Sequence, residues 1–132
     1  MKLLLSSTLL AGVALPAWAG PLPTKIGSCA RSSIKEIGYR LSSTDKNGVY
    51  IPVTGSSTSI TYLNGGYQVS CEMVSAIFNS REKDPVEICL AFIPECHHAQ
   101  AGDMRGRSYL VKNLRTGKTW ELPDSQHMCG GA

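Results

Sequence analysis

The sequence predicts an all-β protein, a small antiparallel β-sandwich or barrel that is stapled by disulfides and holds little helix. Three observations predict this fold. Short runs of β-branched and aromatic residues recur along the chain, and turn residues interrupt them at intervals of about 8–12 residues. Apolar and polar residues alternate within several of these runs, as they do in half-buried strands. The chain also carries five cysteines, and small exported domains commonly use cysteines as a disulfide framework.

Residues 1–19 have the pattern of a signal peptide. A basic start and an apolar run precede small residues at the two positions that a signal peptidase reads. The apolar run of about 13 residues is shorter than the roughly 20 that span a bilayer. We therefore expect cleavage after Ala19. An extended lead over residues 20–28, in which prolines oppose helix, then precedes a single β-rich domain over residues 29–132.

Composition excludes several classes of protein. The 132-residue chain is 42% hydrophobic and 17% charged, which are proportions of a folded domain rather than of a disordered tail. Its formal net charge of +3 is too small a surplus to indicate a nucleic-acid partner. No later segment is apolar enough to cross a membrane, so no membrane partner is expected after cleavage. The oligomeric state is left open.

The first half of the domain predicts four strands. Residues 35–41 alternate between apolar and polar side chains, and an Asn-Gly turn separates them from an edge strand over residues 49–53. The clearest hairpin pairs residues 57–63 with residues 67–74 across an Asn-Gly-Gly turn.

The second half predicts a central strand and a second hairpin. Residues 86–93 are densely apolar, as a central strand would be, and a long irregular loop follows over residues 95–105. The last hairpin pairs residues 108–114 with residues 119–122. A short helix has support only near residues 74–79.

The five cysteines predict two disulfides and one free thiol. Cys29 and Cys129 lie near the two ends of the domain, so a bridge between them would hold both termini. Cys89 and Cys96 are close enough in sequence to close a local loop. Cys71 falls between apolar residues of a predicted strand and is expected to be a buried free thiol. Spacing alone does not fix the connectivity, so other pairings stay open.

Histidine and sulfur side chains gather near the C-terminal cysteines and raise the question of a metal site. The candidate ligands are Cys96, His97, His98, His127, Met128 and Cys129. The chain has no Cys-x-x-Cys motif, and adjacent histidines on an extended chain point to opposite sides. Disulfides would also consume the sulfurs. The pattern therefore predicts no metal site and no cofactor.

Catalysis remains an alternative function. A cysteine–histidine nucleophile is disfavoured because a buried or oxidised sulfur lacks the reactive thiolate. A ribonuclease-like hydrolase would pair His98 with His127 as acid and base. Lys112 or Arg107 would then hold the phosphate. Nothing in the spacing requires these side chains to converge, and the low net charge attracts RNA weakly.

The long loop is the candidate binding surface. Its candidate contact residues are His97, His98, Asp103, Arg105 and Arg107. Two arginines in a glycine-flanked loop can make bidentate contacts with carboxylate, sulfate or phosphate groups. The alternative interpretation is that Asp103 pairs with Arg105 or caps a turn, and that the loop binds nothing.

Two segments carry a resemblance to a known set of proteins. They read NLRTGKTW over residues 113–120 and LPDSQHMCGG over residues 122–131. Through them the chain, from about residue 26 to its end, resembles a family of small exported proteobacterial proteins. The resemblance implies a signal peptide and a small exported domain, and it brings no activity and no site residue with it. Small periplasmic lysozyme inhibitors share the size, the export and the β-rich pattern by analogy alone.

Together these observations favour a periplasmic or secreted, non-enzymatic binding protein. Its partner would be a protein or an anionic ligand of the cell envelope. One form of this hypothesis is an inhibitor that offers residues 95–107 to an extracellular enzyme. A small hydrolase acting on a phosphodiester and a metal-binding envelope protein stay open as alternatives.

Overall fold

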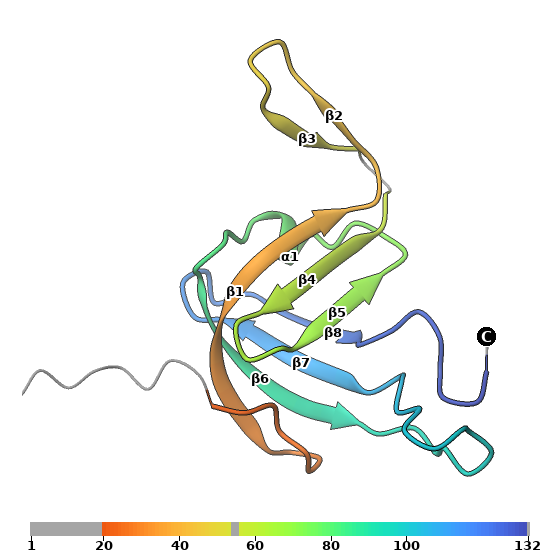
Figure 1. Cartoon of the computed structure of the whole chain (residues 1–132). Helices are drawn as coiled ribbons and strands as arrows, with labels where there is room; N and C mark the ends of the chain where they lie inside the picture. Colours follow the sequence, from red (N-terminus) through yellow and green to blue (C-terminus); the bar gives the residue numbers. More distant parts are fainter. Residues whose placement is uncertain (1–19, 54–55, 132) are drawn as a thin grey trace, which may run out of the picture.

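The computed structural model describes residues 20–53 and 56–131 (Figure 1). The predicted signal peptide, residues 1–19, lies outside the described residues. The described chain is mostly β-strand, with one short helix. In chain order the elements are β1 (Cys29–Tyr39), β2 (Ser42–Thr44), β3 (Tyr50–Pro52), β4 (Thr58–Tyr62), β5 (Tyr67–Ser70), α1 (Ser75–Phe78), β6 (Pro85–Phe92), β7 (Ser108–Asn113) and β8 (Thr119–Pro123).

Six strands form one curled sheet in the order β5-β4-β1-β6-β7-β8, while β2 and β3 form a separate two-stranded sheet (Figure 1). All neighbouring strands are antiparallel. The long strand β1 pairs with β6 through its N-terminal half and with β4 through its C-terminal half. A register shift between Ile34 and Glu36 lies between the two halves, and such irregularities bend a sheet. The predicted all-β fold with little helix is confirmed.

The core fills the inner face of the curled sheet. On β6, Val86, Ile88 and Leu90 are buried while the residues between them are partly exposed. This alternation is what a strand with one face toward the core produces. The core residues are Ile34, Ile60, Tyr62, Ile77, Val86, Ile88, Leu90, Tyr109, Val111 and Trp120.

The amide of Gln68, on edge strand β5, ties that strand to β7 and β8. Its Nε2 donates hydrogen bonds to the carbonyl oxygens of Tyr109 at 2.7 Å and Leu122 at 2.9 Å. Its Oε1 accepts hydrogen bonds from the Tyr62 hydroxyl at 2.7 Å and from Trp120 Nε1 at 3.0 Å. Gln68 is 1% exposed, and its amide uses both donors and both acceptor positions. A side chain rather than a backbone ladder thus joins the two edges of the sheet.

A second buried polar group lies at the start of β6. Asp84 is 5% exposed and accepts hydrogen bonds from the Arg115 guanidinium at 2.6 and 2.9 Å and from Asn113 Nδ2 at 2.9 Å. The backbone N–H of Arg81 also donates to it. The Arg115 hydrogen bonds are the main reason why the pKa of Asp84 falls from 3.8 to about 2, and burial opposes them.

We expect acid to destabilise the protein through Asp84. The Asp84 carboxylate has a lower pKa in the folded chain than in the unfolded chain. Its stabilising contribution to the folded state is therefore present above about pH 4 and is lost as the pH falls through 2. A shift of this size corresponds to about 2 kcal/mol in the free energy of unfolding. Urea unfolding at pH 6 and at pH values near 2 measures it. Asp84→Asn should remove this part of the pH dependence, whereas Glu121→Gln, at an exposed position of β8, should leave it unchanged.

The disulfides join Cys29 to Cys89 and Cys96 to Cys129. The predicted bridges, Cys29–Cys129 and Cys89–Cys96, are therefore wrong, although the same four cysteines take part. Cys29 and Cys89 are opposite residues of the neighbouring strands β1 and β6. The order of the strands in the sheet, which spacing in the sequence does not reveal, determines this pairing. Two disulfides indicate an oxidising environment.

Three predicted strands differ from those in the structure. The predicted strand over residues 67–74 ends at Ser70, so Cys71 is exposed rather than buried, although its thiol is free as predicted. The strand predicted over residues 35–41 begins much earlier, as β1. The edge strand predicted over residues 49–53 is β3, which lies outside the main sheet. Within the part of the chain that the structure describes, no helix has the length and apolar character that crossing a membrane requires.

Candidate functional site

Residues 95–107, which follow β6, and residues 124–131, which follow β8, form one irregular surface that we call the loop–tail platform (Figure 1). The Cys96–Cys129 disulfide joins its two segments. The backbone N–H of Cys129 donates to the carbonyl oxygen of Arg105 at 2.9 Å. Closer to the sheet, the N–H of Asp124 donates to the carbonyl oxygen of Arg107 at 2.8 Å. One covalent bond and two backbone hydrogen bonds therefore hold the tail against the loop.

An ion pair inside the platform adds to these links. Arg105 donates from Nε to Asp103 Oδ1 at 2.9 Å and from Nη2 to Asp103 Oδ2 at 3.0 Å. The N–H of Gly130 also donates to Asp103, at 3.1 Å. The Arg105 hydrogen bonds hold the pKa of Asp103 well below its usual range. The structure thus contains the Asp103–Arg105 pair that the sequence left as an alternative to ligand binding.

Gly106 allows the tail to approach the loop closely. Its φ is 104°, a conformation that other residues rarely adopt, and a Cβ there would lie 3.3 Å from the Met128 Cα. The N–H of Gly106 donates to Asp124 Oδ1 at 2.7 Å. A larger residue at this position would push the tail away from the loop.

The histidines of the platform point into solvent. His97 lies 3.8 Å from Glu95 Oε2, and both side chains are more than three-quarters exposed. His98 and His127 are exposed as well. Among residues 20–53 and 56–131, no hydrogen bond joins His98 to His127.

Arg107 is the cationic group of the platform that has no carboxylate partner among the described residues. Its Nε is buried without a hydrogen-bond partner in that part of the chain, and its Nη2 lies 3.5 Å from the Met104 sulfur. Met104 and Met128 are 53% and 50% exposed. Exposed methionines adapt to many surfaces and recur where proteins contact other proteins.

Charges on the platform nearly cancel. Three acidic and two basic residues lie within its two segments, namely Glu95, Asp103, Asp124, Arg105 and Arg107. The platform therefore offers no general attraction to an anion at neutral pH.

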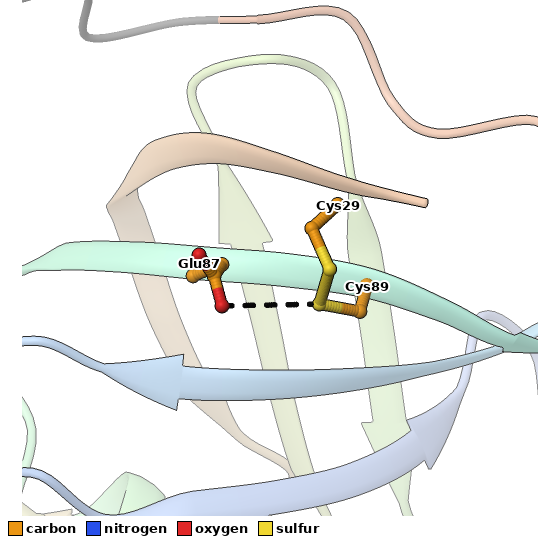
Figure 2. Close-up of side chains that lie close together, drawn as sticks. All are labelled: Cys29, Glu87 and Cys89. Atoms are coloured by element: carbon orange, nitrogen blue, oxygen red, sulfur yellow. Dashed lines mark hydrogen bonds between the residues drawn. A yellow bond between two sulfur atoms is a disulfide. The ribbon is translucent and has the colours of Figure 1, made fainter. Parts of the chain in front are cut away.

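The histidines and sulfurs that the sequence offered as candidate metal ligands do not form a compact group among the described residues. The group that does lie close together is Cys29, Glu87 and Cys89, whose ligand atoms are within 4.8 Å of one another (Figure 2). Glu87 Oε1 is 4.0 Å from Cys89 Sγ. Because the two sulfurs are bonded to each other, neither is a thiolate, and the group does not fit a metal ion in this state.

Sequence reasoning considered the tail only as a source of metal ligands and missed its contact with the loop. Asp124, Met128 and Gly130 contact the loop through links that follow from the Cys96–Cys129 bridge. The knowledge that Cys129 bonds to Cys96 would have placed these three residues against the loop. No family model, curated protein or solved structure matches the chain.

Proposed function

We propose that this chain is a small exported binding protein that contacts a protein partner through the loop–tail platform and catalyses no reaction. The observation that carries the proposal is that a disulfide and an ion pair hold an irregular, exposed surface in one conformation. Irregular segments cost conformational entropy when a partner orders them, and pre-organisation lowers that cost. The Cys96–Cys129 disulfide and the Asp103–Arg105 pair supply such pre-organisation.

A protein partner is favoured over a small anionic ligand. Arg105, which could have held an anion, is already occupied by Asp103, and the charges of the platform nearly cancel. Arg107 remains as a single anchor for a partner carboxylate. Met104 and Met128 would supply apolar contact beside it. An inhibitor of an extracellular enzyme is the form of this function that a rigid loop suits best.

Export is part of the proposal. The two disulfides support an oxidising destination, and residues 1–19 supply the leader that would take the chain there. Periplasmic or secreted delivery would leave a mature protein that begins at Gly20.

The proposal predicts that substitutions in the platform weaken a specific complex. Mature protein, confirmed by mass to begin at Gly20, is used to capture partners from the envelope fraction of its own cells, and each captured protein is purified. The affinity of that protein should fall by about 10-fold or more for Arg107→Ala and Met104→Ala, because central anchor residues carry most of the binding free energy. Lys112→Ala, on the exposed side of β7, is the matched control and should bind like wild type.

Two results would count against this function. One is that every captured protein binds the platform variants and the Lys112→Ala control equally well. The other is turnover of a phosphodiester that disappears in both His98→Ala and His127→Ala, which would instead establish the hydrolase alternative.

A further inference from the structure

Two of the four asparagines of the chain directly precede a glycine. Asn47 lies at the tip of the β2–β3 hairpin, which projects away from the rest of the molecule (Figure 1), and Asn64 lies in the turn between β4 and β5. An Asn-Gly bond favours attack of the backbone nitrogen on the asparagine side chain, because glycine has no Cβ to crowd that nitrogen. Asparagine is accordingly a thermolabile residue. The sequence therefore offers two equivalent reactive sites, and the structure distinguishes between them.

The carboxamide of Asn64 is held at both of its ends. Its Nδ2 donates to the Gly20 carbonyl oxygen at 3.2 Å, and its Oδ1 accepts from the Gly66 N–H at 3.3 Å. The backbone N–H of Asn64 donates to the Ser32 hydroxyl at 3.2 Å, and the residue is partly buried. Turning the Asn64 side chain toward the Gly65 nitrogen would break both hydrogen bonds of the carboxamide.

The carboxamide of Asn47 is free by comparison. Asn47 is exposed, and its side chain makes no hydrogen bond to any residue that the structure describes. Only its backbone N–H is engaged within that part of the chain, as a donor to Asp45 Oδ1 at 2.8 Å. The space beside Gly48 is open, because a Cβ there would meet no atom within 4 Å. The other two asparagines, Asn79 and Asn113, both donate hydrogen bonds from Nδ2.

The glycine nitrogens of the two sites are alike. The Gly48 N–H donates to the Asp45 carbonyl oxygen and the Gly65 N–H to the Tyr62 carbonyl oxygen, both at 3.0 Å. Gly48 and Gly65 also share a positive φ, of 78° and 87°. Attack by either nitrogen must break one backbone hydrogen bond. The two sites therefore differ in the asparagine side chain, which is held at Asn64 and free at Asn47.

We propose that Asn47 is a site of spontaneous deamidation in the folded protein, with water as the co-reactant, and that the fold protects Asn64. The Gly48 nitrogen loses its proton to solvent and bonds to Asn47 Cγ, while the Cγ–Nδ2 bond breaks and ammonia leaves. Water then opens the cyclic imide. Breaking the new bond at Cγ gives aspartate, and breaking the bond at the main-chain carbonyl gives isoaspartate. The net change is the replacement of an amide by a carboxylate, without oxidation or reduction.

The reaction changes both the charge and the backbone of the hairpin tip. The charges of Asp45 and Lys46 cancel each other, and either product adds a carboxylate beside them. Isoaspartate also lengthens the backbone within a turn that the Asp45 carboxylate closes by accepting the N–H groups of Asn47 and Val49. The site belongs to the β2–β3 hairpin and not to the loop–tail platform, so the modification is independent of the proposed function.

Peptide mapping tests the selectivity. The mature wild-type protein is incubated in mildly alkaline buffer, and tandem mass spectrometry of its digest measures aspartate and isoaspartate at each asparagine over time. In the folded protein, Asn47 should convert at least about 10-fold faster than Asn64, because two hydrogen bonds hold the Asn64 carboxamide in place. In the same buffer with guanidinium chloride, which unfolds the chain, the two rates should become similar, since both asparagines precede a glycine.

Ion-exchange chromatography of the intact protein tests the assignment to Asn47. Wild type should accumulate a more acidic form during the incubation, and Asn47→Gln should not, because the longer side chain does not form the same imide ring. Asn79→Gln, at another exposed asparagine, is the matched control and should accumulate the acidic form as wild type does. Equal rates at Asn47 and Asn64 in the folded protein, or the same ratio of rates after unfolding, would overturn the proposal. So would an acidic form that accumulates equally in Asn47→Gln.

Discussion

Gln68→Ala should destabilise the protein by about 3–5 kcal/mol. The substitution leaves a cavity in the core and removes the partner of four hydrogen-bonding groups, two of which are the carbonyl oxygens of Tyr109 and Leu122. The Tyr62 hydroxyl and Trp120 Nε1 keep only the contact of 3.2 Å between them. Because these groups lie on β4, β7 and β8, the loss would also release edge strand β5 from the opposite edge of the sheet.

Urea unfolding of the mature protein, followed by the fluorescence of Trp120, measures this effect. A domain of this size has a total stability of roughly 5–15 kcal/mol, so the variant should lose a large part of it. Gln100→Ala, at an exposed position of the loop, is the matched control and should change stability by less than about 0.5 kcal/mol. Equal unfolding midpoints for the two variants would mean that the Gln68 network contributes nothing to closing the sheet.

Removing the Cys29–Cys89 disulfide should have an effect of similar size. The two cysteines are 60 residues apart in sequence, and a loop of that length corresponds to roughly 4 kcal/mol on the chain-entropy model. Cys29→Ala, Cys89→Ala should therefore lower the midpoint of urea unfolding strongly. The bond restrains β1 against β6, the strand pair at the centre of the main sheet.

Cys71→Ala is the matched control for the disulfide variant. It removes an exposed sulfur that takes part in no bridge, and its effect should stay within about 0.5 kcal/mol. The Cys96–Cys129 loop, with a separation of 33 residues, should contribute nearly as much by the same model. Its loss should in addition make the C-terminal tail a substrate for proteases, which limited proteolysis detects. Unchanged stability in both Cys29→Ala, Cys89→Ala and Cys96→Ala, Cys129→Ala would contradict the stabilising role of the two disulfides.

The strands and turns of this protein were largely predictable because they depend on local chemistry. A run of β-branched and aromatic residues identified β4, and the Asn-Gly-Gly turn identified the reversal between β4 and β5. Alternation alone failed after β5. The apolar pattern continues through Met73, but the Glu72 N–H donates to the Ser70 hydroxyl and the chain turns there. A local hydrogen bond therefore ended a strand that the pattern extended, and it left Cys71 exposed.

The candidate site was harder to predict because it depends on contacts between distant segments. The sequence correctly offered an Asp103–Arg105 ion pair as one interpretation, because residues of opposite charge two positions apart can form an ion pair whatever the fold around them. The contact between Asp103 and Gly130 spans 27 positions and depends on which cysteine bonds to Cys129. Because β1 lies beside β6, Cys29 bonds to Cys89, and this leaves Cys96 to bond to Cys129. No local pattern encodes the order of strands in a sheet.

The position of the β2–β3 hairpin between β1 and β4 has a consequence for how this protein can vary. β1 and β4 are direct neighbours, and Tyr39 pairs with Thr58 at the end of their ladder. The β2–β3 hairpin thus occupies the place of an ordinary hairpin loop. The entropic cost of closing a loop rises only slowly with its length, so the main sheet is compatible with inserts of very different size at this point. Related chains could lengthen, shorten or lose this insert while keeping the same core.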